Sequence, residues 1–162
     1  MCYELTRPIP MRNEAHEFHT FSGQPGNDFR AASTHTCFSL HKCVSQAVPE
    51  LVSGVPAEKN TIINDVYEDL FVCTHKETLN AILVRLGKAI IKASQNSIIH
   101  ISAKPIGNIL LVHFKSNHAH HSQELTQSLQ QTEALAERLG GCITISHNGK
   151  YGMDLAFTFV NH

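Results

Sequence analysis

Apolar residues recur at steps of three and four along three stretches of the chain, which is the spacing of one face of an α-helix. The stretches are residues 39–53, 74–94 and 122–139. Their apolar faces consist of Leu40, Val44, Val48 and Val52; Leu79, Ile82, Leu83, Leu86 and Ile90; and Leu125, Leu129, Thr132, Leu135 and Leu139. The pattern therefore predicts three amphipathic helices, each with one face toward a core.

The ends of these helices are also marked in the sequence. Thr74 followed by Glu77 predicts a capping box, in which each side chain satisfies a backbone donor at the helix start. Ser122 is the predicted N-cap of the last helix, and Gly140 and Gly141 predict its end. Pro49 predicts a kink or break in the first helix, because proline supplies no backbone donor.

Alternation of apolar and polar residues predicts strands over residues 97–104 and 108–114, joined by a turn at residues 105–107. In a last hairpin, Ile143 and Ile145 face residues 155–159, and shorter β-prone runs cover residues 62–66 and 70–73. Helices and strands interleave, and hairpins predominate. The predicted fold class is a two-layer α/β sandwich with helices on one face of a mixed, mostly antiparallel sheet.

Residues 82–92, ILVRLGKAIIK, follow the register of a nucleotide-binding helix that typically reads I-L-x-N-L-x-x-N-A-x-K. Together with this helix, residues 36–160 resemble the ATPase domain of sensor histidine kinases, the GHKL or Bergerat type. The resemblance extends to the order helix, hairpin, helix, double glycine and closing hairpin. Arg85 and Ala89 stand at the two asparagine positions.

The resemblance implies a nucleotide site that this chain lacks. The family holds magnesium with a helix asparagine and reads adenine with an aspartate in a D-x-G-x-G pattern after the second hairpin strand. Ala89 offers no oxygen, and Arg85 cannot ligate a cation. Ser116 and Asn117 stand where the aspartate is expected, and the helix at Ser122 follows with no room for a glycine-rich lid. The implied domain is degenerate, with vestigial nucleotide-site positions, no catalytic residue and no cofactor.

The function expected on this basis is that of a non-catalytic regulatory or protein-binding module in bacterial signal transduction. The resembled domain docks against kinase dimerisation helices and a receiver domain, so these are the expected kinds of partner, and a homodimer is left open. Arg85, Lys88, Lys92 and Lys115 are predicted to gather into a surface for an acidic partner. The alternatives are an active ATP-binding kinase or ATPase with substituted residues, and a small metal- or ligand-binding module.

Histidines suggest other chemistry only weakly. His118, His120 and His121 are candidate metal ligands, but no cysteine lies near them in sequence, so we expect adventitious binding and no native metal. His41 lacks the neighbours of the family's phosphoacceptor histidine. A nucleophile at Cys73 beside His75 lacks an oxyanion motif.

The composition sets the remaining limits. The chain has 162 residues and a formal net charge of −1, which gives no whole-chain reason to expect nucleic acid or a membrane as partner. No apolar run reaches the roughly 20 residues that span a bilayer, and we expect a cytoplasmic protein. Residues 1–35 are predicted to be an irregular or partly disordered arm, and residues 36–162 the ATPase-like domain. The cysteines, predicted to be free thiols, are Cys2, Cys37, Cys43, Cys73 and Cys142.

Overall fold

The structure is a computed structural model that describes residues 36–53, 60–148 and 152–162. The predicted N-terminal arm, residues 1–35, lies outside the described residues. The elements in chain order are β1 (Thr36–Ser39), α1 (Leu40–Val52), β2 (Thr61–Asn64), β3 (Phe71–Thr74), α2 (Lys76–Ala93), β4 (Ile98–Ile106), β5 (Ile109–Ser116), α3 (Gln123–Arg138), β6 (Cys142–Asn148) and β7 (Gly152–Val160).

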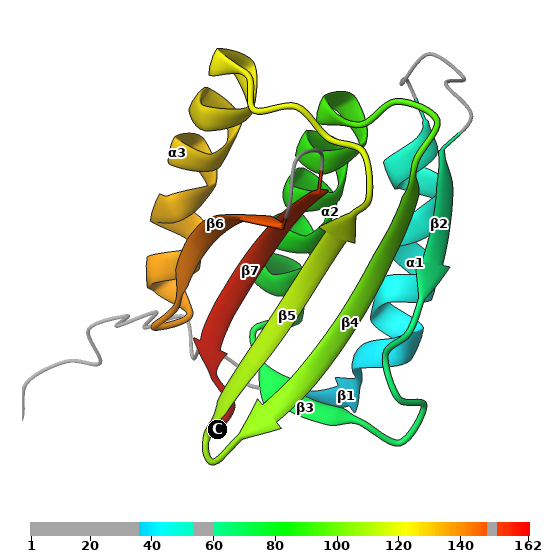
Figure 1. Cartoon of the computed structure of the whole chain (residues 1–162). Coiled ribbons are helices and arrows are strands. Elements are labelled where there is room, and N and C mark those ends of the chain that lie inside the picture. The colour runs from blue at the N-terminus through cyan, green and yellow to red at the C-terminus, as the bar shows by residue number, and fades with distance from the viewer. Residues whose placement is uncertain (1–35, 54–59, 149–151) are drawn as a thin grey trace, which may run out of the picture. The chain divides into compact units, whose positions relative to one another are not determined.

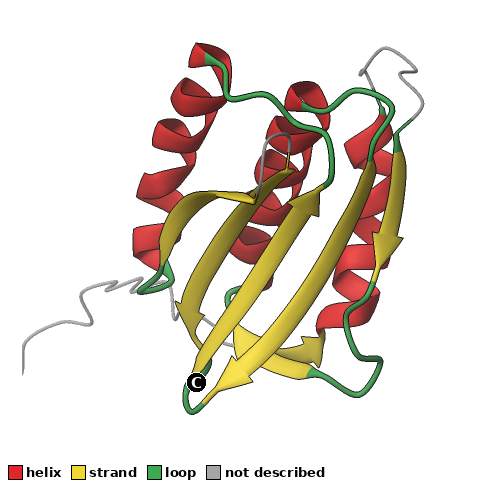
Figure 2. Cartoon of the chain, in the orientation of Figure 1, coloured by secondary structure: helices red, strands yellow, loops and turns green. Residues whose placement is uncertain are grey.

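The main sheet has the strand order β2-β4-β5-β7-β6. Strand β2 runs parallel to β4, and the other neighbours are antiparallel. The three helices cover one face of this sheet, as Figure 1 and Figure 2 show. The predicted sandwich is therefore confirmed. A separate two-stranded sheet of β1 and β3, which the sequence pattern did not predict, lies below the main sheet in the view of Figure 1.

Helix α2 is the central helix, and its predicted face is buried. Leu79, Ile82, Leu86 and Ile90 are fully buried, together with Phe114, Phe157 and Phe159 of the sheet. Helix α1 packs closely against α2 at Gly87, where an added Cβ would lie 2.5 Å from Leu51 Cδ2. The spacing of three and four thus translates directly into the core that holds the two layers together.

Helix α3 begins and ends as predicted. The Ser122 side chain accepts a hydrogen bond from the Leu125 amide, and Glu124 lies in the first turn. Gly140, with φ +63°, follows the last turn, and the Gly140 amide donates to the Glu137 carbonyl. A left-handed residue is common at this place, and glycine adopts that conformation without a Cβ penalty.

The predicted capping box of α2 is wrong, and of the two effects predicted for Pro49 the split is wrong while the kink stays a prediction. The N-cap of α2 is His75, whose Nδ1 accepts from the Thr78 amide, whereas Thr74 is buried at the end of β3. Pro49 does not split α1, which continues to Val52. The predicted turn at residues 105–107 is also shorter than expected. Strand β4 continues to Ile106, which pairs with Ile109, and Gly107 supplies the positive φ of the turn.

The prediction of free thiols is wrong for two cysteines. Cys37 on β1 and Cys73 on β3 stand opposite each other in the antiparallel pair and form a disulfide. The Cys73 amide also donates to Asn161 Oδ1, and the His162 amide donates to the Cys73 carbonyl. The spacing of 36 residues had hidden the pair, because only the β1–β3 pairing brings the two side chains together.

Within the described residues, none of the helices combines the length and the apolar character that a bilayer crossing requires.

Candidate functional site

A polar groove runs between α2 and α3, and it contains the position where the nucleotide helix would need its second asparagine. One cavity of about 230 Å³ is bounded by Ala89, Lys92, Ala93, Ser122, Glu124, Leu125, Gln127, Ser128 and Gln131. A neighbouring cavity of about 200 Å³ is bounded by Arg85, Lys88, Ala89, Lys92, Ser128, Gln131 and Thr132. We call the two cavities together the α2–α3 groove.

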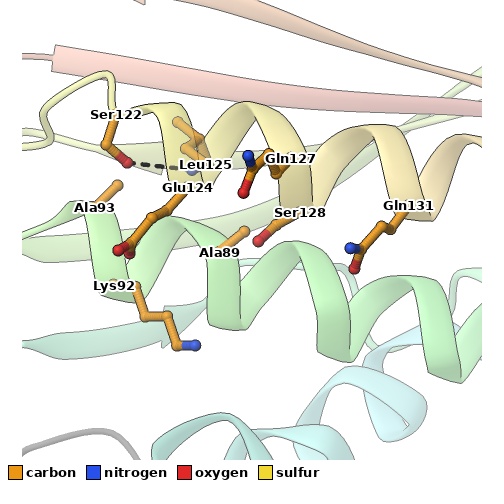
Figure 3. Close-up of a pocket in the computed structure, with 9 residues that line it drawn as sticks. All are labelled: Ala89, Lys92, Ala93, Ser122, Glu124, Leu125, Gln127, Ser128 and Gln131. Carbon is orange, nitrogen blue, oxygen red and sulfur yellow. Dashed lines mark hydrogen bonds between the residues drawn. The ribbon is translucent and has the colours of Figure 1, made fainter.

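The floor of the groove is made of small residues. Ala89 and Ala93, one turn apart on α2, are both buried. Figure 3 shows Glu124, Ser128 and Gln131 on α3 with their polar ends on the side of α2, while the Lys92 ammonium points away from α3. Ala89 presents only a methyl group where the resemblance expects a magnesium ligand, so this wall has no side-chain oxygen for a hard cation.

Three of the four predicted interaction residues lie together. Arg85, Lys88 and Lys92 follow one another at helical spacing on the outer side of α2. The Arg85 Nη1 donates to the Gln131 carbonyl at 3.3 Å, and the Lys88 Nζ lies 3.7 Å from Glu50 Oε1 of α1. The row is therefore tied to both neighbouring helices while its charges stay at the surface.

Lys115 lies apart from that row. On β5 the buried side chains of Phe114 and Ser116 face the helices, so Lys115 between them faces the opposite side of the sheet. There its Nζ is 3.8 Å from Asp154 Oδ2, and His113 Nδ1 is 2.8 Å from Asp154 Oδ1. The predicted gathering of four cations is thus reduced to three by the alternation of the strand.

Ser116 and Asn117, at the positions expected to read adenine, belong to a closed hydrogen-bond network. We call this network the serine cluster, and it consists of Ser94, Ser97, Ser116 and Asn117. The Ser116 hydroxyl lies 2.8 Å from that of Ser94 and 2.6 Å from that of Ser97. Asn117 Oδ1 accepts from the Ser97 hydroxyl at 2.6 Å and from the Ile98 amide at 2.9 Å. The three serines are buried, so their hydroxyls are used inside the protein.

The segment after β5 is joined to the end of α2. The His120 amide donates to the Ala93 carbonyl at 2.8 Å, and the Gln95 amide donates to the His118 carbonyl at 3.4 Å. Ser94 and Ala119 form a β-bridge between these contacts, and Ala119 is buried. Residues 117–121 therefore pack against the C-terminal end of α2, where the resemblance places a mobile lid.

The serine cluster was missed in the sequence, although two signals for it were present. Ser116 continues the alternation of Leu110, Val112 and Phe114, so period two already placed it on the buried face. Ser94 follows Ile90 by four residues on the buried face of α2, and its hydroxyl donates to the Ile90 carbonyl. A polar residue in phase with a core pattern predicts an internal hydrogen-bond partner.

The candidate metal ligands do not converge. Nε2 of His121 lies 3.4 Å from Thr126 Oγ1, and the His121 ring stacks edge-on against His147. His118 contributes its carbonyl to the contact with α2, and His120 is exposed. Among the residues that the structure describes, no three histidine, cysteine or acidic side chains are placed to share a metal ion. The expectation that binding is adventitious stays a prediction.

The remaining sequence candidates have structural roles. Cys73 is in the disulfide, so it is not a free nucleophile beside His75. His41 Nδ1 lies 2.7 Å from the Val66 carbonyl, and the His41 carbonyl accepts from Asn64 Nδ2. His41 thus helps to fix α1 against β2 and the residues that follow it.

The fold is shared with histidine kinase catalytic domains. The catalytic domain of histidine kinase ThkA superposes with a TM-score of 0.66 at 16% identity, over 78% of this chain and 95% of that one. Histidine kinase AdeS of Acinetobacter baumannii gives 0.68 at 14% identity, over 79% and 68%. ThkA in complex with the response regulator protein TrrA gives 0.63 at 17% identity, over 79% and 42%.

No protein-family model and no curated protein sequence matches the chain. The likeness therefore rests on the three-dimensional arrangement and not on sequence.

Proposed function

We propose that this domain is a degenerate relative of the histidine kinase ATPase domain that no longer binds ATP and acts by binding another protein in bacterial signal transduction. The observation that carries the proposal is the serine cluster. Ser116 and Asn117, at the expected adenine-reading positions, both hydrogen-bond to Ser97, Ser116 also contacts Ser94, and the segment after them is joined to α2. A nucleotide would have to break these bonds before it gained its own.

The metal side of the site supports the same proposal. Triphosphate chemistry needs a cation held by oxygen ligands, and the buried methyl group of Ala89 supplies none. Arg85 can attract phosphate, but its guanidinium is a donor only and cannot take over the role of a ligand. Loss at two separate ends of one site is harder to compensate than loss of one group.

A fold that has lost its ligand chemistry still offers a surface. One structure with this fold, ThkA, is in complex with a response regulator protein. A receiver domain and kinase dimerisation helices are accordingly the kinds of partner proposed, in the cytoplasm. The surface proposed for them includes the Arg85, Lys88 and Lys92 row on α2.

The test is titration with ATP and Mg²⁺ by calorimetry and by thermal shift. We expect no heat and no change in melting temperature at physiological nucleotide concentration. Binding would be easy to detect, because a ligand at a hundred times its Kd stabilises a protein by about 2.7 kcal/mol. A clear stabilisation by ATP would replace this proposal with an active kinase or ATPase that uses substituted residues.

A parallel measurement addresses the metal-binding alternative. Treatment with a chelator should leave the melting temperature unchanged. Removal of a native structural metal would instead lower it, because such a metal contributes folding energy directly. Stoichiometric metal in the purified protein, or unfolding on chelation, would favour a metal-binding module instead.

A further inference from the structure

The two cavities of the α2–α3 groove adjoin each other, because both are bordered by Ala89, Lys92, Ser128 and Gln131. The groove is therefore elongated along the two helices. Its buried floor residues, Ala89 and Ala93, carry only methyl groups, so a chain lying in the groove can approach the α2 backbone closely. This shape fits an extended segment better than a compact ligand.

The α2 wall carries positive charge that the protein itself neutralises only in part. Lys88 has Glu50 at 3.7 Å, and the Lys88 side chain is partly exposed while that of Glu50 is exposed. Within the described residues, no carboxylate forms an ion pair with Arg85 or Lys92. Acidic side chains of a bound segment would meet these cations at a partly desolvated surface, where charge pairs are stronger than in open water.

The α3 wall is polar and uncharged over most of its length. Gln127, Ser128 and Gln131 line it, and among the described residues their side chains make no hydrogen bond to the protein. Amide and hydroxyl groups both donate and accept, so they can satisfy the unpaired N–H and C=O groups of an extended backbone. The α2 wall can thus pair with acidic side chains of a bound segment, and the α3 wall can hydrogen-bond to its backbone.

The groove also has a direction. Glu124 lies at the Ser122 end, whereas Arg85 and Lys88 lie toward the other end. Figure 3 shows the Glu124 carboxylate over the Ala93 end of α2. An acidic residue placed there would be repelled, while a basic residue would be attracted. The best occupant is therefore acidic over the Arg85 end and basic over the Glu124 end.

We propose that the α2–α3 groove binds an extended, bipolar peptide segment of a partner protein, with its acidic residues over Arg85 and Lys88 and a basic residue beside Glu124. This inference rests on the proposed docking function and assigns the chemistry of the docked segment. The fold is kept, and the space between the helices takes a peptide in place of a nucleotide.

The experiment uses the full chain and fluorescent peptides of equal length in an anisotropy titration. One peptide alternates Glu and Ala throughout. The other has Glu and Ala in one half and Lys and Ala in the other, made in both chain directions. We expect one direction of the bipolar peptide to bind tightest. Arg85→Glu with Lys88→Glu should weaken it by about tenfold or more, since two attractions become repulsions.

Two variants separate a built groove from general charge attraction. Glu124→Gln should remove the preference for the bipolar peptide over the uniformly acidic one, because the repulsive end is gone. Lys42→Glu with Lys104→Glu makes the same change in net charge at exposed sites away from the groove and should leave binding unchanged. Equal weakening by this control pair, or no binding of any peptide to the wild type, overturns the proposal.

The result also stays distinct from that of the nucleotide titration. Absence of peptide binding together with absence of ATP binding refutes the groove assignment alone and leaves protein docking at another surface. Binding of ATP with Mg²⁺ refutes the docking function itself, whatever the peptides do.

Discussion

The two ends of the region where the resemblance expects a nucleotide differ in structure. At the end near β5, the serine cluster and residues 117–121 fill the space with internal hydrogen bonds. Along α2 and α3 the space stays open as a groove with cations on one wall. Under the proposed function, the closed end excludes a ligand, and only the open end offers a surface to a partner.

The largest expected effect comes from breaking both regions at once. Leu86 is fully buried on α2, the helix that carries the groove wall and ends at the serine cluster. Leu86→Ala should lower the free energy of unfolding by about 2–5 kcal/mol through lost burial and a cavity. Urea denaturation measures the change. The volume-conserving Leu86→Met should cost less than about 1.5 kcal/mol; similar losses for both variants would argue against tight packing at this position.

The closed end can be tested by itself with Ser116→Ala. This change removes a hydroxyl that contacts both Ser94 and Ser97 in a buried place, so we expect a loss of about 1–3 kcal/mol in denaturation experiments. Ser102→Ala, on the neighbouring strand β4 but only partly buried, is the matched control and should stay within about 0.5 kcal/mol. If the two variants lost the same amount, the cluster would have no special structural role.

The open end can be tested with Ala89→Asn, which places an asparagine side chain at the position where the resemblance expects one. We expect a loss of stability of about 1–2 kcal/mol, because alanine is the better helix former and the asparagine amide enters a largely buried position. We also expect no gain in ATP affinity, because residues 117–121 still occupy the other end. Thermal shift with ATP and Mg²⁺ measures both. Stabilisation of this variant by ATP would show that the closed end is no barrier to nucleotide.

The smallest expected effect on stability is at the surface cations. Arg85→Glu with Lys88→Glu should change the free energy of unfolding by less than about 1 kcal/mol, because exposed ion pairs and hydrogen bonds contribute little. The same variant is expected to lose peptide binding. A large destabilisation here would mean that the row holds the helices together and is not free to serve a partner.

Local signals in the sequence were sufficient for elements whose causes are local. The Ser122 cap, the Gly140 end and the helical face of α2 each depend on residues within a few positions of one another. The alternation in β5 was also present, yet it was not used for Ser116 or Lys115. The same alternation, continued to the end of the strand, places Ser116 on the buried face and Lys115 on the opposite face of the sheet.

Other features depend on residues far apart in sequence and could not be predicted in this way. Strand β1 and the Cys37–Cys73 disulfide exist only because β1 pairs with β3 across 36 residues. The parallel pairing of β2 with β4 likewise requires the intervening α2. The N-cap of α2 is His75 and not Thr74, because Thr74 is the last residue of β3 and pairs with Thr36.

The distribution of thiols has a practical consequence for spectroscopy. Cys37 and Cys73 are joined, and burial raises the pKa of the Cys43 thiol, which keeps it protonated and unreactive at neutral pH. Cys142 on the edge strand β6 is exposed and free. In a Cys2→Ser background and without reductant, a maleimide dye should therefore attach at Cys142 alone. Because Cys142 is not among the groove-lining residues, such a probe would report partner binding without occupying the site.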